Sequence, residues 1–318
     1  MATTPLVDVH AHFVTDSYVV AARAAGITHP DGMLAWATWS LIEQLELMER
    51  GGIAKSYLSI SSPGVHFGDD VAARSLAREV NEYGAGLRRE HPDRFGHFAS
   101  LPLPDVAGSL AAAAYALDKL GSDGVAVETN AHGVYLGDPS LDPLWTELDR
   151  RGALVFVHPT TPPAGEQTSL GRPRPLMEFL FDTARAASDL VYARVLMRFP
   201  HIRWVLTHTA GVLPLLVDRM DAFRPLMMPE LADDPAVRDQ LGGVWFDMAG
   251  TPFPRAVPAF DAAFGTDRLL YGSDYCWTPL DGALAQIASI DAAEQPSDTD
   301  SWRDLTTRNA DALLRRNR

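Results

Sequence analysis

The amino-acid sequence predicts an α/β fold, a (β/α)8 TIM barrel in which eight parallel strands alternate with helices. Eight short runs rich in apolar and β-branched residues recur along the chain, and amphipathic, helix-like segments lie between them. The runs are apolar nearly throughout, as are the strands of a parallel sheet that is covered on both faces. A length of 318 residues suits one such barrel. A doubly wound open sheet is the alternative arrangement of the same elements.

The element boundaries follow from this alternation and from turn residues. In RRGALVFVHP, for example, a helix ends, a glycine makes the turn and a buried strand begins. The predicted strands cover residues 7–13, 54–61, 94–102, 124–130, 154–159, 202–209, 244–250 and 269–275. The predicted helices cover residues 41–51, 70–91, 106–121, 141–152, 176–199, 212–223 and 254–265, and a helical tail follows from about residue 280.

The chain is expected to form one domain over residues 1–318, because no internal repeat, low-complexity tract or long linker divides it. Two connections are long for a barrel. They are residues 14–39, after the first strand, and the proline-rich residues 159–175, after the fifth. Long connections in compact domains are often functional, so we expect both segments to form pocket loops.

Composition excludes several classes of function. The formal net charge is −14, and only Lys55 and Lys119 are lysines, whereas nucleic acids and anionic membranes bind clustered Lys and Arg. The sequence contains no run of about 18 apolar residues, the length that a membrane span needs. The N-terminus lacks a signal-peptide pattern. The single Cys276 cannot form an internal disulfide, which indicates a reducing, cytoplasmic location. We therefore expect a small-molecule partner, and neither nucleic acid nor membrane.

Histidines and one aspartate lie at the ends of four predicted strands. His10 and His12 are two apart in VDVHAHFV, so both side chains leave the same face of the first strand. His158 ends the fifth strand, His208 the sixth and Asp274 the eighth. In a barrel these strand ends meet on one face, and imidazoles with a carboxylate suit Zn²⁺ or a similar divalent ion. The His-x-His pair alone is equally compatible with two buried structural histidines, but the joint placement favours a metal site.

Three further residues lie beside this predicted site. Asp247 ends the seventh strand, and it is expected either to orient a ligand histidine or to cap the segment that follows. His132 lies just beyond the fourth strand, where it could face the pocket. Cys276 is expected to be a small buried thiol rather than a nucleophile, because no activating partner is visible.

The order of the motifs resembles the amidohydrolase superfamily. His-x-His on the first strand, VFVHP on the fifth, LTHTAG on the sixth and YGSDY on the eighth are similar to the branch that contains aminocarboxymuconate semialdehyde, dihydroxybenzoate and methylsalicylate decarboxylases. Longer stretches such as NEYGAGLRREHPDRFGHFASLPLPD also resemble that branch, along nearly the whole chain. The likeness is closest to 6-methylsalicylate decarboxylase-type proteins.

This resemblance implies a distorted, amidohydrolase-type barrel with a metal held by His10, His12, His158 and Asp274. It implies that His208 is a catalytic or water-orienting residue near the metal. Binuclear members of the superfamily use a carboxylated lysine at the end of the fourth strand, and GVAVETN contains no lysine. We therefore expect one divalent ion, with Zn²⁺ preferred and Mn²⁺ possible.

The resemblance also suggests a homodimer. This chain departs from the family pattern at two positions. The chain has HTAG, with Thr209, where the family often has HGGG or HAGG, and it has Cys276 where the family often has proline. Both changes fall at the expected pocket, and they leave the exact substrate open.

The predicted function is a metal-dependent, non-oxidative decarboxylation of a small aromatic, salicylate-like or enol-type carboxylic acid. The ion would orient the carboxylate, and Asp274 with His208 would handle the proton. The same residues would also serve a metal-dependent hydrolase of a lactone, an amide or a C–C bond, acting through a metal-activated water. A metal-holding barrel without catalysis is the third hypothesis.

Four residues are expected to contact the substrate: Phe13, Asn130, Arg185 and Trp277. Arg185, and after it Arg219, would supply a cation for an anionic acid, although both also suit salt bridges on helix surfaces. Further aromatic candidates for the pocket wall are Trp36, Trp39 and Phe181, for which ordinary core packing is the alternative.

Overall fold

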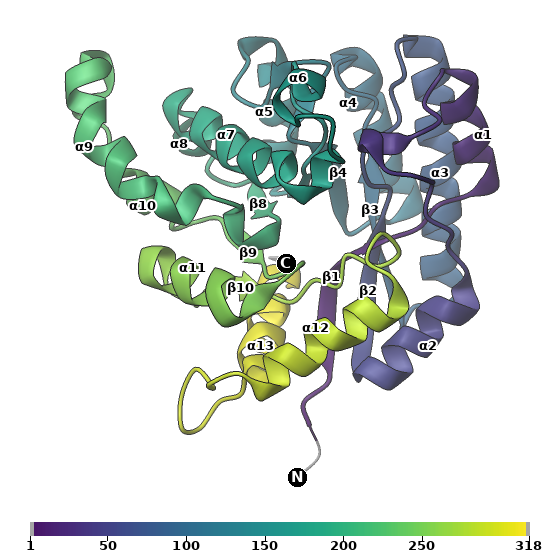
Figure 1. Ribbon diagram of the computed structural model, residues 1–318. Coiled ribbons are helices and arrows are strands. Elements are labelled where there is room, and N and C mark those ends of the chain that lie inside the picture. Colours follow the sequence, from purple (N-terminus) through teal and green to yellow (C-terminus); the bar gives the residue numbers. More distant parts are fainter. Residues whose placement is uncertain (1–2, 316–318) are drawn as a thin grey trace.

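Eight parallel strands form one sheet that curls into a (β/α)8 barrel, as predicted (Figure 1). The computed structural model describes residues 3–315. The barrel closes where the first strand meets the last, because Asp8 pairs with Tyr271 and Ala11 with Tyr275 in parallel bridges. In order around the sheet, the strands are β1 (Leu6–His12), β2 (Ile53–Ser59), β3 (Phe95–Ser100), β4 (Gly124–Glu128), β7 (Leu154–His158), β8 (Arg203–Leu206), β9 (Trp245–Asp247) and β10 (Leu269–Leu270).

Helices surround the barrel (Figure 1). They are α1 (Asp16–Ala24), α2 (Leu41–Gly51), α3 (Asp70–Glu90), α4 (Val106–Tyr115), α5 (Asp142–Arg150), α6 (Gly165–Thr168), α7 (Glu178–Tyr192), α8 (Val195–Arg198), α9 (Val217–Met227), α10 (Val237–Leu241), α11 (Val257–Phe264), α12 (Leu280–Ala292) and α13 (Trp302–Leu314). Shorter 3-10 and π turns are η1 (Pro30–Gly32), η2 (Ala116–Leu120), η3 (Pro139–Leu141), η4 (Arg174–Leu176), η5 (His208–Ala210), η6 (Leu213–Leu215), η7 (Pro229–Leu231) and η8 (Pro252–Ala256).

The inside of the barrel changes from apolar to polar along the strands. Tyr57, Phe98 and Phe156 stack in its apolar layer, with ring centroids 5.3 and 5.5 Å apart. Side chains two residues apart on a strand face the same way. Two residues beyond Phe156 lies His158, and Ala126 and Trp245 are likewise followed by Glu128 and Asp247. The apolar layer therefore supports a polar layer at the carboxyl ends of the strands, while α13 contacts β1 and β10 and contributes Ala310 and Leu313 to the apolar layer.

Several predicted boundaries are wrong in instructive ways. The predicted helix 176–199 is divided into α7 and α8, because Arg194 has a positive φ of 58° that a helix does not allow. The predicted strand 269–275 pairs as a strand only at Leu269–Leu270, and its remainder is held to β1 by separate hydrogen bonds. The predicted strand 202–209 ends at Leu206, so His208 lies in the turn beyond it.

The long connections contain structure of their own. Residues 14–39 include α1 and the turn η1, and residues 159–175 include α6 and most of η4. A small hairpin that the sequence did not predict, β5 (Asn130–Ala131) with β6 (Val134–Tyr135), follows β4. Every helix within residues 3–315 is too short or too polar to cross a lipid bilayer.

Candidate metal centre and active site

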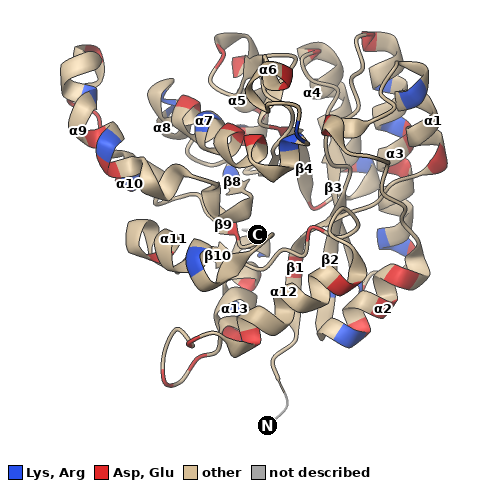
Figure 2. Ribbon diagram, in the orientation of Figure 1, with Lys and Arg blue, Asp and Glu red and all other residues tan. Residues whose placement is uncertain are grey.

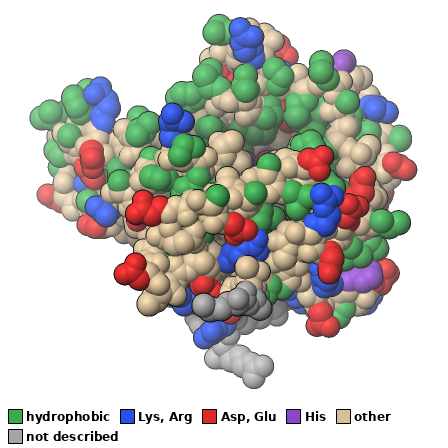
Figure 3. Space-filling view, turned by 60° about the horizontal axis from the view of Figure 1, so that its bottom comes forward, with side chains coloured by type: hydrophobic (Ala, Val, Ile, Leu, Met, Phe, Trp, Pro, Cys, Tyr) green, Lys and Arg blue, Asp and Glu red, His purple; other side chains and the backbone are tan. Residues whose placement is uncertain are grey.

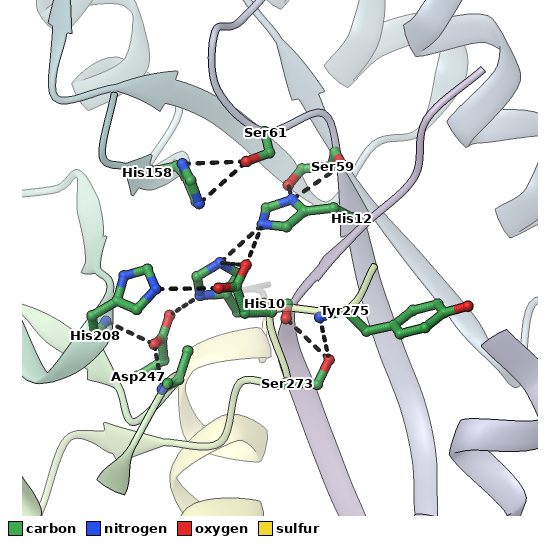
Figure 4. A network of polar contacts seen from close by, with 12 residues as sticks. His10, His12, Ser59, Ser61, His158, His208, Asp247, Ser273 and Tyr275 are labelled. Atoms are coloured by element: carbon green, nitrogen blue, oxygen red, sulfur yellow. Dashed lines mark hydrogen bonds and ion pairs between the residues drawn. The ribbon is translucent and has the colours of Figure 1, made fainter. Parts of the chain in front are cut away.

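Four side chains converge at the carboxyl ends of the strands. They are His10 and His12 from β1, His158 from the end of β7, and Asp274 from the segment after β10. One donor atom from each lies within 4.8 Å of the other three, and the histidines are buried. The Nε2 atoms of His10 and His12 are 2.9 Å apart, and Asp274 Oδ1 lies 3.4 and 3.3 Å from them. With Asp274, the three histidines, which are labelled in Figure 4, form the metal-binding site that the strand ends predict.

Each ligand histidine is held by an oxygen atom on its far side. His10 Nδ1 lies 2.8 Å from Asp247 Oδ2, and His158 Nδ1 lies 2.7 Å from the carbonyl oxygen of Pro159. His12 Nδ1 lies 3.3 Å from the carbonyl oxygen of Ser59. Because carboxylate and carbonyl oxygens only accept, Nδ1 of each ring carries the hydrogen and donates it. The Nε2 lone pairs are therefore the atoms turned toward a common point, as in protein metal sites.

The electrostatics of the group fit a cation. Burial holds the pKa of His12 below its usual value and that of His158 well below, so both rings are neutral. Burial opposes a charge on His10 too, but Asp247 and Asp274 outweigh it and raise the pKa of His10 to about 10. The neighbouring imidazoles of His10, His12 and His208 overcome burial and hold the pKa of Asp274 well below its usual value.

One of the donor atoms also lacks a hydrogen-bond partner. Asp274 Oδ1 is buried without a hydrogen-bond partner within the described residues. Two carboxylates beside His10 favour a positive charge there, which a divalent ion at Nε2 would supply in place of a proton. Three imidazoles and one carboxylate are a donor set suited to Zn²⁺ or Mn²⁺.

Asp247 links the metal site to His208. While Oδ2 of Asp247 accepts from His10, Oδ1 accepts from the backbone N–H groups of His208 at 3.0 Å and Ala249 at 2.9 Å. Both roles expected for Asp247 are thus confirmed. His208 lies in η5 with a positive φ of 56°, and its Nε2 atom is 3.5 Å from Asp274 Oδ2. The side chain of His208 therefore lies beside the metal ligands without belonging to the four-residue group.

Asp8 is a functional residue that the sequence interpretation missed. Its Oδ1 accepts from the backbone N–H of His10 at 3.1 Å and of Ser273 at 3.0 Å, and its Oδ2 accepts from Ser273 Oγ at 2.7 Å. The side chain is fully buried, and this burial raises the pKa of Asp8 to about 6. Asp8 thus ties β1 to the residue before Asp274. The sequence did contain a signal for this role, because Asp8 is an ionisable residue two positions before His10, on the same face of a buried strand.

Glu128 occupies the end of β4, where the sequence offered no lysine. Its Oε2 atom lies 3.6 Å from His158 Nδ1. Burial, with a contribution from Asp31, holds the pKa of Glu128 well above its usual value. The two lysines are remote from this point in the sequence, and Lys55 donates to the carbonyl oxygen of Pro92. The end of β4 therefore carries a carboxyl group in place of a bridging lysine.

A cavity of about 400 Å³ opens over the metal site, within the size range of pockets for small ligands. One side is apolar and includes Phe179, Leu180 and Trp277, and the other includes the hydroxyl groups of Ser61 and Ser62. No Lys or Arg of the described chain lines this cavity. Figure 2 shows that most Lys and Arg lie on the surrounding helices, and Figure 3 shows hydrophobic side chains around a hollow in the upper part of the molecule.

The four residues that were expected to contact the substrate do not lie around one cavity. Trp277 lines the metal cavity. Phe13 is buried in the core against Tyr83, with ring centroids 5.5 Å apart, and it does not line the cavity. Asn130 lines a second cavity and donates to Asp182 at 3.0 Å. Substrate contact stays a prediction for Trp277, whereas nothing in the structure places Phe13 or Asn130 at the metal cavity.

The expected cations lie elsewhere. The Arg185 guanidinium, half exposed, pairs with Asp182 at 2.5 Å and does not line the metal cavity. Arg219 stacks over Phe223, with its guanidinium carbon 4.4 Å from the ring centroid. Burial raises the pKa of Cys276 to about 12, which keeps it a thiol as expected. Neither expected arginine thus lines the metal cavity.

Asp247→Asn should weaken metal binding by roughly 10- to 100-fold, the usual effect of losing a partner behind a ligand histidine. The amide keeps one oxygen for the backbone of His208 and Ala249, but its NH₂ group then faces His10 Nδ1–H. Competition with a chromogenic chelator measures the affinity. Asp189→Asn, at a carboxylate that accepts from the backbone of Gly137 away from the metal, is the matched control. An unchanged affinity in Asp247→Asn would show that Asp247 does not support the metal site.

Comparison with known proteins agrees with this geometry. Residues 7–317 match the protein family described as amidohydrolase. The 6-methylsalicylic acid decarboxylase of Penicillium expansum is 32% identical over 298 residues, which cover 92% of this chain and 91% of the relative. A crystal structure of an amidohydrolase II protein is similar with a TM-score of 0.89 and 32% identity, over 97% of this chain and 99% of that chain.

A dihydroxybenzoic acid decarboxylase from Polaromonas sp. JS666, solved with bound manganese, has the same fold. It has a TM-score of 0.82 and 21% identity, over 99% of this chain and 98% of that chain. The family match extends over nearly the whole sequence, including every residue of the metal group. The chain therefore belongs to the amidohydrolase family.

Proposed function

We propose that this protein is a metal-dependent, non-oxidative decarboxylase of a small aromatic acid of the salicylate class. The observation that carries the proposal is the position of the metal ligands and His208 at the base of a cavity of about 400 Å³ with an apolar side. A monocyclic acid suits this space. The relative from Penicillium expansum acts on 6-methylsalicylic acid according to its name, which supports the same substrate class here.

We propose that the protein binds one divalent ion, held by His10, His12, His158 and Asp274. The histidine-rich donor set favours Zn²⁺, whereas the manganese in the structure from Polaromonas supports Mn²⁺. When bound, the ion would supply a positive charge that favours an anionic acid and stabilises the charge that develops as the C–C bond breaks.

The protein's own groups then position the ring and move the proton. Phe179, Leu180 and Trp277 provide apolar contacts for the ring. His208 Nε2, 3.5 Å from Asp274 Oδ2, passes a proton to this carboxylate, which delivers it to the ring carbon that bears the CO₂ group. The ring carbon keeps the electron pair of the C–C bond, CO₂ leaves, and His208 takes up a proton from solvent.

The expected result is that the metal-loaded protein releases one CO₂ for each molecule of 6-methylsalicylate that is converted to the decarboxylated phenol. His208→Asn should lower kcat by roughly 10²- to 10⁴-fold, because the proton relay is broken, and it should retain the metal. His201→Asn is the matched control, since His201 is an exposed histidine paired with Asp149. Chromatography of the phenol together with CO₂ detection makes the measurement.

One outcome would contradict the decarboxylase, and another would contradict the role of His208. Turnover of a lactone or amide without CO₂ release would instead support the alternative, a hydrolase acting through a metal-activated water. An unchanged kcat in His208→Asn would remove His208 from the proposed proton transfer, even if CO₂ is released.

We also propose that the protein is a homodimer, in a reducing, cytoplasmic setting that suits the buried Cys276 thiol. Large apolar side chains are exposed where η4 meets α7 and along the adjoining η6 and α9. They are Leu176, Met177, Phe181, Leu215, Leu216, Phe223, Leu226 and Met227, which are 36–78% exposed. At roughly 100 Å² each, they approach the 800 Å² or so that one partner buries in a stable interface.

A second copy is the occupant that this apolar face fits. Both copies carry a net charge of −14, so apolar burial must outweigh their repulsion. The face includes Leu176, which also lines the metal cavity, so association would cover the edge of the site. Figure 3 shows hydrophobic side chains gathered over α9, at the left of the view.

The double variant Leu226→Glu/Met227→Glu should convert the dimer into a monomer, because it places two like charges where the two copies meet. Light scattering after size-exclusion chromatography gives the molar mass. Ile42→Glu, at a side chain that is 79% exposed on α2, is the control that should leave the dimer intact. A wild-type protein that is already monomeric at micromolar concentration would contradict the proposal.

A further inference from the structure

A second cavity lies beside the metal cavity at the same end of the barrel. Its volume is about 410 Å³, close to that of the metal cavity at about 400 Å³. It lies over β2, β3, β4 and β7, and its apolar side includes Val65, Leu101 and Leu103, which are all buried. No Lys or Arg among residues 3–315 lines it. The rest of the lining is polar and includes Glu128, Asn130 and the imidazoles of His66 and His132, so it is the apolar side that suits a hydrocarbon group.

Two hydrogen bonds between side chains form a partition between the cavities. Ser62 Oγ lies 2.7 Å from Thr160 Oγ1, and Thr161 Oγ1 donates to Asp31 Oδ1 at 2.5 Å. In each pair, one residue lines the metal cavity and the other lines the second cavity. Ser62 and Asp31 face the metal side, and Thr160 and Thr161 face the second cavity. The partition is therefore only two small side chains thick at these points.

The partition comes from connecting segments rather than from the strands of the barrel. Asp31 belongs to residues 14–39, and Thr160 and Thr161 belong to residues 159–175, the two segments expected to form pocket loops. Asp31 has a positive φ of 51°, and its Oδ2 atom is buried without a hydrogen-bond partner in the described part of the chain. An unsatisfied buried oxygen lowers the stability of this contact, and the volume of the two threonine side chains keeps the cavities apart, so truncation of both side chains should open the partition.

We propose that the Ser62–Thr160 and Asp31–Thr161 partition determines substrate specificity, by limiting the length of the ring substituent that the metal cavity accepts. An aromatic acid that carries a short alkyl group fits the metal cavity alone. A longer alkyl chain needs the space of the second cavity, where Val65, Leu101 and Leu103 would contact it. This inference rests on the proposed function for the identity of the acid, but not for the existence of the partition.

The test compares two double variants that differ in volume. Thr160→Ala/Thr161→Ala removes the hydroxyl and methyl groups and should join the cavities, whereas Thr160→Val/Thr161→Val keeps the volume and loses only the hydrogen bonds. Calorimetry measures Kd for 6-alkylsalicylates from methyl to pentyl, in the His208→Asn background so that the acids are not consumed. The alanine variant should bind the pentyl acid at least tenfold better relative to the methyl acid, since each buried methylene contributes roughly fourfold. The valine variant should keep the parent ratio.

A second series of probes separates this proposal from the proposed function. Linear alkyl hydroxamates chelate a protein-bound Zn²⁺ or Mn²⁺ whatever reaction the protein catalyses. If only the hydroxamates bind, and the alanine variant prefers the longer ones, the partition is supported and the salicylate substrate is wrong. If either series binds and the ratio of long to short ligand stays within twofold of the parent, the partition proposal is overturned.

Thermal melting and metal content confirm that each variant is folded. If the double alanine variant does not fold, Thr161→Ala alone removes the hydrogen bond to Asp31 and about half of the partition, and it should still shift the ratio toward long ligands. An unchanged ratio in a folded Thr161→Ala protein would then count against the proposal.

Discussion

The contact between the first and last strands is the constraint on which the site depends. Closure of the barrel places His10 and Asp274, which are far apart in the sequence, side by side: the backbone N–H of Asp274 donates to the carbonyl oxygen of His10 at 2.8 Å. Asp8 reinforces the contact by accepting from the backbone of both His10 and Ser273. Without this closure, the chain would present three histidines but no carboxylate among them. The metal site is therefore a property of the complete barrel.

The alternation of side chains along the strands positions the other residues of the site. A rigid apolar layer of Tyr57, Phe98 and Phe156 lies beneath the polar ends, so the ligand rings sit on packed side chains rather than on loops. Asp247 is placed by the same rule, two residues beyond Trp245. Because Asp247 contacts both His10 and the backbone of His208, it couples the position of the proposed proton relay to the position of a metal ligand.

The fold and the metal ligands were predictable because both follow from local periodicity. His10 and His12 are two apart on a strand, and His158 and Asp274 fall near strand ends, which meet in any parallel barrel. The sequence could not show which contacts the connecting segments make. Arg185 was a reasonable candidate for the cation that binds an anionic substrate. However, Asp182 lies one turn away on α7 and pairs with Arg185, and the unpredicted β5–β6 hairpin brings Tyr135 to Arg185. The turn of His208 and the pairing of Asp31 with Thr161 depend likewise on long-range packing.

Elemental analysis of the purified protein would show whether the four side chains hold one divalent ion. We expect about one Zn²⁺ or Mn²⁺ per chain in the wild type and its loss in His10→Ala/His12→Ala, with the fold checked by circular dichroism. A wild-type protein that holds no metal after reloading, or a folded double variant that keeps it, would show that these side chains do not form a metal site. The histidines of the first strand would then be buried structural residues.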